Sequence, residues 1–322
     1  MILLLLGTAF TIELAIGPTA LAPFEALRLL FFGNADEPFT IIVREIRLPR
    51  ALAGVFVGAT LGLAGATLQG MLRNPLADPG AIGVSPMAGL GAVIAIYSGF
   101  AAGFSLAIPL FAMAGALLAT FFLMVLSARE TSVLTIILVG IGIGSLAVSL
   151  TSLVINISPD PFAVSDIVLW LLGSLQNRSY TDLMLAGPFM IVGCGLLLSA
   201  GNGLRLLTLG EDTARNLGLD LRGLHLKVVL GAALAVGSSV AMVGAVGFVG
   251  LVVPHMVRPF LGHDPGRILV PSALAGALLV LIADIGVRTA PATQELKLGV
   301  LTGLLGAPFF LYLVIKTRRS LR

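Results

Sequence analysis

The chain has 322 residues and a net charge of +3; 57% of its residues are hydrophobic and only 11% are charged. A soluble domain carries about 25% charged residues, so this chain has too few to cover a water-facing surface. The composition excludes a soluble globular domain and predicts an integral membrane protein.

Apolar segments long enough for a membrane span, which needs about 20 residues, recur along the chain. They predict an all-α membrane protein with a single transmembrane domain, residues 1–322. The eighth segment is short and carries Pro254 and Pro259, which predicts a broken half-helix covered by protein or a cavity. The ten predicted spans are Ile2–Ile16, Ala51–Leu72, Ile82–Phe100, Leu106–Leu126, Val133–Ile155, Leu183–Ala200, Leu224–Val243, Val246–Phe260, Ile268–Val287 and Leu298–Ile315.

The first segment has two interpretations, a secretory signal or an uncleaved first span. No Lys or Arg precedes it, which favours the uncleaved span. With ten spans and both termini in the cytoplasm, twelve of the 19 basic residues fall on the cytoplasmic side, as the positive-inside rule expects. The other seven fall outside: Arg28, Arg44, Arg47, Arg50, Arg178, Arg288 and Lys297. These outer cations run against the rule and call for a separate explanation, such as a docking site.

Glycine is abundant, with 39 residues, and small residues let membrane helices approach closely. Gly58, Gly62 and Gly65 lie in the second span, and a second glycine group precedes Pro254. The patterns Ser85–Gly89 and Ser272–Gly276 resemble each other at these two places. This pattern fits an inverted repeat, which is common in transporters, and equally fits a coincidence in a glycine-rich chain.

The longest polar interruption is Asn202–His225. Thr208 or Asp212 can cap a short helix there, and Gly218 can end it with a sharp turn. Ala214 and Leu217 are three residues apart, which predicts that they share one helix face. The alternatives are a solvated loop and a short amphipathic helix that presses into a partner.

Metal and catalytic constellations find little support in the sequence. Cys194 is the single cysteine, and His225, His255 and His263 stand in no ligand spacing. An intramembrane enzyme is therefore disfavoured. An ion-coupled secondary transporter is a second alternative, but it needs acids within its spans, and only Asp284 clearly qualifies.

Several stretches resemble the FecCD-type permeases of ABC importers, which carry iron chelates, heme and vitamin B12. The matching stretches cover nearly the whole chain in order and spacing. They are Arg47–Arg50, Gln69–Pro79 continuing through Ser85, Leu209–Gly218, Gly247–Arg258, Glu295–Gly299 and Gly303–Phe310.

The resemblance implies a type II ABC importer permease in the bacterial inner (plasma) membrane. Its partners would be a second copy of itself, a cytoplasmic ABC ATPase dimer, a periplasmic substrate-binding protein and membrane lipid, with no nucleic acid. The sequence contains no G-x-x-x-x-G-K-[ST] loop, so ATP and Mg are expected on the partner ATPase and no cofactor on this chain. Heme is the favoured substrate, because Pro161–Ser174 and Asn177–Ser179 resemble heme importers; ferric siderophores and cobalamin stay open.

The resemblance also implies three groups of site residues. Arg47, Arg50 and Arg288 would dock the binding protein, against the alternative of anchoring lipid headgroups. Asn74, Pro75 and Leu76 would form the inner gate, facing Val133 and Leu134, against the alternative of a plain helix-ending turn. Glu211, Ala214, Arg215, Leu217, Gly218 and Leu219 would couple to the ATPase.

Two single residues carry separate expectations. Asp284 is predicted to bind a backbone N–H or a neighbouring helix, because transport driven by ATP needs no proton relay. His255 is disfavoured as a heme ligand, since tight iron binding midway along the pathway would slow release.

Overall fold

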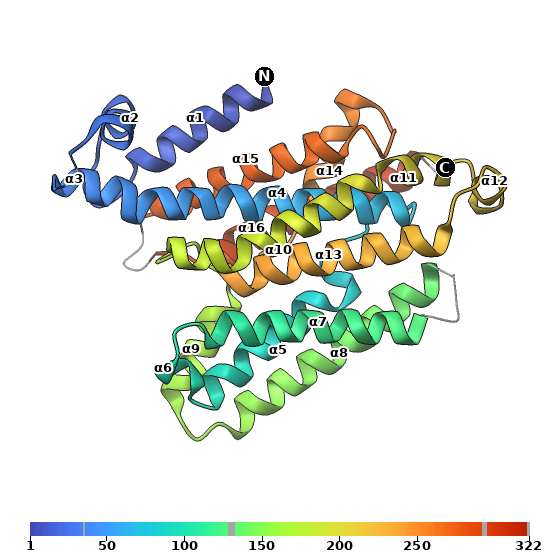
Figure 1. Ribbon diagram of the computed structural model, residues 1–322, viewed down its shortest axis with the longest axis horizontal. Coiled ribbons are helices and arrows are strands. Elements are labelled where there is room, and N and C mark those ends of the chain that lie inside the picture. The colour runs from blue at the N-terminus through green and yellow to red at the C-terminus, as the bar shows by residue number, and fades with distance from the viewer. Residues whose placement is uncertain (35, 128–132, 292–294, 321–322) are drawn as a thin grey trace.

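The computed structural model describes the chain apart from residues 35, 128–132, 292–294 and 321–322 (Figure 1). The described residues are helical and contain no strand. In chain order the elements are α1 (Ile2–Ala15), α2 (Pro23–Phe32), α3 (Pro38–Ile41), the π-helix η1 (Ile42–Arg47), α4 (Leu48–Met71), the 3-10 helix η2 (Pro79–Ile82), α5 (Val84–Tyr97), α6 (Phe100–Gly103), α7 (Ala107–Ser127), α8 (Val133–Ile157), α9 (Pro161–Leu171), α10 (Tyr180–Ser199), α11 (Gly201–Leu207), α12 (Glu211–Asn216), α13 (Leu221–Val243), α14 (Val249–Leu261), α15 (Leu269–Thr289) and α16 (Leu298–Ser320).

The predicted all-α fold of about ten spans is confirmed. Each of the ten predicted segments matches a helix whose ends lie within a few residues of those expected: α1, α4, α5, α7, α8, α10, α13, α14, α15 and α16. Among the described residues, six helices are long and apolar enough to cross a membrane by length and composition alone. The sequence did not indicate α2, α3, α6, α9 and α11, which are short.

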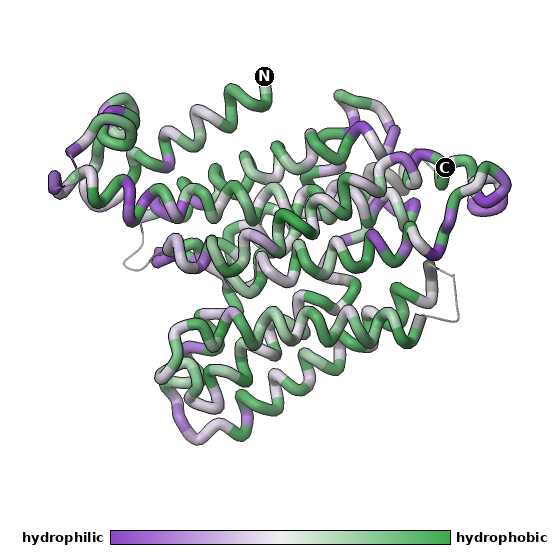
Figure 2. The backbone as a smooth tube through the Cα atoms, in the orientation of Figure 1, coloured by the Kyte–Doolittle hydropathy of each residue, from purple (hydrophilic) through white to green (hydrophobic). Residues whose placement is uncertain are grey.

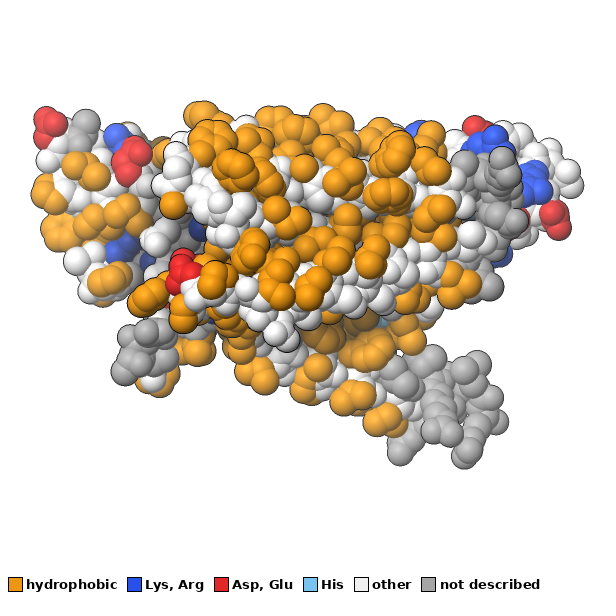
Figure 3. Space-filling view, turned by 90° about the horizontal axis from the view of Figure 1, so that it is seen from below, with side chains coloured by type: hydrophobic (Ala, Val, Ile, Leu, Met, Phe, Trp, Pro, Cys, Tyr) orange, Lys and Arg blue, Asp and Glu red, His pale blue; other side chains and the backbone are white. Residues whose placement is uncertain are grey.

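Hydropathy follows the long axis of the bundle (Figure 2). The helices are apolar along their middles, and polar segments gather at the two ends. The face seen in Figure 3 carries a broad apolar belt, with its charged side chains toward the ends. We call the end that holds α2, α3, α6 and α9 the outer end, and the end that holds α11 and α12 the inner end, following the predicted orientation.

The eighth predicted span is a short helix, as its prolines predicted. α14 has 13 residues, and an irregular stretch from Gly244 to Gly247 precedes it. At 1.5 Å per residue, 13 residues span about 20 Å, less than the hydrocarbon core of about 30 Å. Protein covers the irregular stretch: Gly244 faces the carbonyl of Trp170, and Ala245 faces Gly173 and Gly299.

Helix α4 occupies the centre and packs against α15, α14, α13 and α10. The most apolar 18-residue stretch of the helix that contains α4 is 78% buried, and so is that of α13. The corresponding stretches of α8 and α10 are only 33% buried. α4 and α13 therefore form the interior of the bundle. α8 and α10 present most of their surface to whatever surrounds this chain.

Glycines let α4 reach its neighbours backbone to backbone. Gly58 faces Gly276 and Ala277, Gly62 faces Ser272, and Gly65 faces Gly250. A Cβ atom on Gly58 would lie 2.7 Å from the Cα of Ala277, closer than real Cβ atoms come. The close approach predicted for these small residues is confirmed, while the inverted repeat stays a prediction.

We expect Gly58→Ala to destabilise the protein by about 1–3 kcal/mol, because α4 and α15 must separate to admit the methyl group. Gly195→Ala is the matched control: it also lies inside a helix, and a Cβ atom there meets nothing within 4 Å. Thermal unfolding in detergent measures both variants. Equal melting temperatures for the two would contradict this account of the α4–α15 contact.

Candidate functional sites at the outer and inner ends

Two arginines close the C-terminal end of α1 at the outer end. The last carbonyls of a helix have no partner within the helix, and cationic donors suit them well. Arg47 donates to the carbonyls of Leu14 (2.8 Å) and Ala15 (2.7 Å). Arg288 donates to the carbonyls of Glu13 (2.9 Å) and Ile16. These two side chains hold α1 against η1 and α15.

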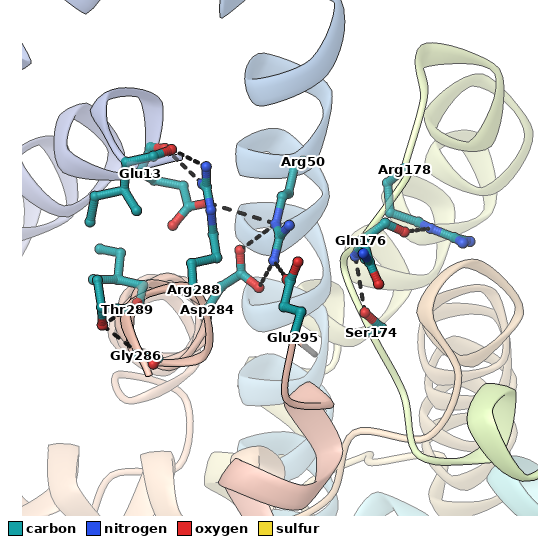
Figure 4. A network of polar contacts seen from close by, with 12 residues as sticks. Glu13, Arg50, Ser174, Gln176, Arg178, Asp284, Gly286, Arg288, Thr289 and Glu295 are labelled. Carbon is teal, nitrogen blue, oxygen red and sulfur yellow. Dashed lines mark hydrogen bonds and ion pairs between the residues drawn. The ribbon is translucent and has the colours of Figure 1, made fainter. Parts of the chain in front are cut away.

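Arg50 forms ion pairs with three other parts of the chain: α15, the segment before α16 and, at 3.9 Å, Glu13 of α1 (Figure 4). Its guanidinium donates to both carboxylate oxygens of Asp284 on α15, at 2.7 and 2.9 Å. It also donates to Glu295, which precedes α16. Arg288 in turn pairs with Glu13 on α1. The prediction that Asp284 binds a neighbouring helix is confirmed.

The outer cluster is balanced in charge. It holds three arginines, Arg47, Arg50 and Arg288, and three acids, Glu13, Asp284 and Glu295. Arg50 and Arg288 pair with the acids, whereas Arg47 binds carbonyls. Removing one partner of such a buried pair typically costs about 3–5 kcal/mol, because the other charge is left uncompensated.

The arginines of this cluster are turned inward. Arg47 is 2% exposed and Arg50 is 9% exposed. In this arrangement their guanidinium groups hold the protein's own carbonyls and carboxylates. Their role in docking a binding protein stays a prediction, and it would require these contacts to rearrange or the few exposed atoms to suffice.

The outer cluster lines a cavity of about 790 Å³. Beside it lies a smaller cavity of about 410 Å³, and the two share Gln176, Asn177 and Arg178 on the segment between α9 and α10. Figure 4 places Arg178 beside Ser174 and Gln176, away from the arginines on α4 and α15. The sequence did not single out this segment as a cavity wall.

At the inner end, α4 stops where the Asn74–Leu76 turn begins. The side-chain Oδ1 of Asn74 accepts a hydrogen bond from the N–H of Leu76 at 2.9 Å, and Asn74 and Pro75 are exposed. The helix itself ends at Met71, and Arg73, with φ +48, turns the chain before Pro75 is reached. Val133 and Leu134 begin α8, but their side chains lie outside the described residues. The gate therefore stays a prediction.

A buried glutamine ties this turn to α14. Pro254 has no N–H, so the carbonyl of Gly250, four residues earlier, loses its helical partner. Gln69 is 2% exposed, and its Nε2 donates to the carbonyls of Gly250 (3.3 Å), Leu251 (3.2 Å) and Ala77 (3.3 Å). Its Oε1 accepts from Arg258 at 2.6 Å.

One side chain thus satisfies a carbonyl that a proline frees and joins α4, the inner turn and α14. Gln69 belongs to a stretch that resembles the family, but the stretch by itself assigns it no role. The sequence signal for this role is Pro254, which leaves a carbonyl without its helical donor. The position of the proline does not show which side chain supplies the missing donor.

The predicted coupling segment forms α12. Glu211 at its start accepts from Arg73 at 3.0 Å, which links α12 to the inner end of α4. Gly218 has φ +87, so the prediction of a glycine-dependent turn is confirmed. The predicted caps are wrong: Gly210 precedes the helix and makes no side-chain cap.

The shared face predicted for Ala214 and Leu217 is also wrong. Ala214 is fully buried against the protein, whereas Leu217 is 58% exposed. The helix ends at Asn216, and Leu217, the next residue, precedes the Gly218 turn. Its N–H still bonds the carbonyl of Thr213 at 3.0 Å, so the two side chains differ in what covers them, not in helical spacing. The exposed apolar residues at this end are instead Leu217 and Leu209, which is 57% exposed. Arg215 is also exposed, while Leu219 is half-buried.

A second ion-pair group braces the inner end. Asp264, between α14 and α15, accepts from Arg205 at 2.9 Å and from the N–H of Gly266 at 2.8 Å. Burial acts to raise the pKa of Asp264, but the hydrogen bonds from Arg205, Gly266 and Arg267 outweigh it and hold that pKa below its ordinary value. Two predicted cytoplasmic cations, Arg129 and Arg322, lie outside the described residues.

Comparison with known proteins places this architecture in one family. The profile of the FecCD transport family matches residues 3–316. The chain belongs to the FecCD transport family. A solved structure described as a metal-chelate type ABC transporter in an inward-facing conformation matches with a TM-score of 0.87 and 31% identity. The match covers 98% of this chain and 97% of that one.

Curated relatives of this FecCD permease are transport subunits. The uncharacterized ABC transporter permease protein YvrB of Bacillus subtilis is 39% identical, covering 89% of this chain and 82% of the relative. The Fe(3+)-citrate import system permease protein YfmD of the same organism is 35% identical, covering 95% and 91%. The vitamin B12 import system permease protein BtuC of Salmonella paratyphi A is 40% identical, covering 87% and 85%. The expected family is confirmed, and these names do not single out heme.

The contacts of Gln69 predict that Gln69→Leu destabilises this FecCD permease by about 1–3 kcal/mol for each buried polar group left unpaired. The stability of Gln69→Glu should fall between that of the wild type and that of Gln69→Leu, because glutamate keeps an acceptor for Arg258 and loses the N–H donors. Thr67→Val is the control, since the equally buried Thr67 bonds only Leu63 of its own helix. Thermal unfolding gives the order, and a Gln69→Leu variant as stable as Thr67→Val would rule out the role given to Gln69.

Proposed function

We propose that this chain is the permease subunit of a binding-protein-dependent ABC importer and forms the pathway for an iron chelate. The observation that carries the proposal is the family match along residues 3–316, together with the likeness to a metal-chelate type ABC transporter over the whole fold. Heme is the favoured cargo, and a ferric siderophore is the next candidate. Cobalamin is the alternative cargo, because the vitamin B12 import permease BtuC is 40% identical to this chain.

The proposed assembly contains two copies of this chain, a cytoplasmic ATPase dimer and a periplasmic binding protein, in the bacterial inner membrane. The wide exposed apolar surfaces of α8 and α16 are compatible with a second copy or lipid. The outer end, with its arginine-lined cavity, is the proposed docking side for the binding protein. Both termini and α12 are proposed to lie in the cytoplasm.

Reconstitution tests the function. We expect the permease alone to hydrolyse no ATP, because the sequence has no nucleotide-binding loop. Proteoliposomes that also contain the ATPase and the binding protein should accumulate hemin or a ferric siderophore only when ATP is present. Uptake by the permease alone, driven by a proton gradient, would instead favour a secondary transporter.

We propose that α12 and the following turn transmit the ATP-driven closure of the ATPase dimer to the membrane-spanning helices. Leu209 and Leu217 supply the exposed apolar contact, and the Arg73–Glu211 pair carries movement to the inner end of α4. Buried Ala214 fixes the helix to its own subunit. The Asn74–Leu76 turn, proposed as the gate, directly follows Arg73 along the chain.

Gly218→Val should uncouple uptake from ATP hydrolysis or release the ATPase, because a β-branched residue is strained at φ +87. Leu217→Glu should act similarly by removing the apolar contact. Thr213→Ala, exposed on the same helix, is the control. Pull-down, ATP turnover and uptake are measured on each variant; normal values for all three in Gly218→Val would remove this segment as the coupling element.

A further inference from the structure

The smaller outer cavity combines features that its role in the fold does not explain. It encloses about 410 Å³, within the range of about 300–1,000 Å³ usual for small-molecule sites. Its lining includes Asp166 and Trp170 from α9, Arg178 from the segment before α10, and Lys297 directly before α16. It adjoins the larger cavity through Gln176, Asn177 and Arg178.

Lys297 makes no side-chain hydrogen bond or ion pair within the part of the chain that the structure describes. It stands at the start of α16, where the helix dipole disfavours a positive charge. The lysine therefore does not serve the helix it precedes. In this respect it differs from Arg47, Arg50 and Arg288, whose charges are all met by acids or carbonyls.

Arg178 is held in place but only partly satisfied. Its Nη1 donates to the carbonyl of Met242 and its Nε to that of Gln176 at 3.1 Å, while Nη2 makes no hydrogen bond within the described residues. No carboxylate lies within ion-pair distance of it among the described residues. A guanidinium with a free N–H edge suits an oxygen anion.

The walls of the cavity are fixed by backbone contacts. The N–H of Ser174 donates to the carbonyl of Val243 at 2.7 Å, and the N–H of Gly299 donates to that of Leu172 at 3.1 Å. These bonds tie the segment after α9 to the end of α13 and the start of α16. Lys297, two residues before Gly299, is thereby placed on a preorganised frame, which lowers the ordering cost of binding.

We propose that this cavity is an outer binding site for the anionic oxygens of the imported chelate, with Lys297 and Arg178 as its cations and Trp170 as the wall for the organic part. The proposal rests on the proposed function and narrows its substrate class. The residues that line the cavity include two cations and one carboxylate, Asp166, so the lining carries a net positive charge. That charge favours carboxylate-bearing chelates, such as heme through its propionates or ferric citrate, over an amide-rich corrinoid.

The test uses the complete complex of permease, ATPase and binding protein in proteoliposomes, with hemin, ferric citrate and cyanocobalamin as probes. We expect Lys297→Gln to raise the KM for the transported anionic chelate by about tenfold, the size of one lost charge-assisted contact. Lys297→Arg should restore it. ATP turnover without substrate should stay at the wild-type level in both variants.

Asp166→Asn should change the KM in the opposite direction, which separates a binding role from general structural damage. Removing this carboxylate should lower the KM for the anionic chelate, whereas general damage to the outer end would raise it. Unchanged KM in Lys297→Gln, or an equal rise in all three variants, would overturn the site. The site would also be overturned if the wild-type complex imported cyanocobalamin but neither hemin nor ferric citrate.

Failure of the proposed function has a different signature. If the wild-type complex imports none of the probes with ATP, the importer assignment fails before the variants are compared. If it imports an anionic chelate and Lys297 has no effect, the importer stands and this cavity is not the site. Melting temperatures of the three variants confirm that each is folded.

Discussion

The structure depends on the direct backbone contact between α4 and the helices around it. The bilayer core offers no hydrophobic driving force between helices, so association relies on close packing. Gly58 and Gly62 bring α4 against α15, and Gly65 brings it against α14. This contact positions the two ends, because α4 carries Arg50 near one end and Gln69 near the other, and Arg47 directly precedes it in η1.

The second constraint is that helices stop inside a protein surrounded by lipid. Each stop leaves carbonyls without partners, and where protein buries them they need a donor from the protein itself. The chain meets this need with long polar side chains: Arg47 and Arg288 at the end of α1, and Gln69 at the carbonyl freed by Pro254. The few charged residues of this apolar chain therefore stabilise helix ends, in addition to any role in transport.

These two kinds of contact divide the molecule into regions suited to different tasks. The interior around α4 and α13 is closely packed, whereas the ends consist of short helices and turns joined by single side chains. At the inner end, Gln69 and the Arg73–Glu211 pair connect α14, the Asn74–Leu76 turn and α12. At the outer end, neither Lys297 nor Arg178 has a carboxylate within ion-pair distance among the described residues.

The sequence by itself determined the class, the ten apolar helices, the broken eighth span and the family. These follow from composition, segment length and local motifs, which are properties of contiguous residues. It also located the Gly218 turn, because a left-handed position is a local requirement. The three-residue spacing of Ala214 and Leu217 misled because only Ala214 is covered by the rest of the chain, and spacing does not record what packs over a short helix.

Only the tertiary structure decided the partners of the charged residues. Arg50 and Asp284 are separated by 234 positions and Gln69 and Gly250 by 181, so no local pattern joins them. The sequence marked the outer arginines as unusual and could not show that three acids balance them. It likewise could not show Lys297 and Arg178 sharing a cavity, since that depends on how the ends of α9, α13 and α16 meet in space.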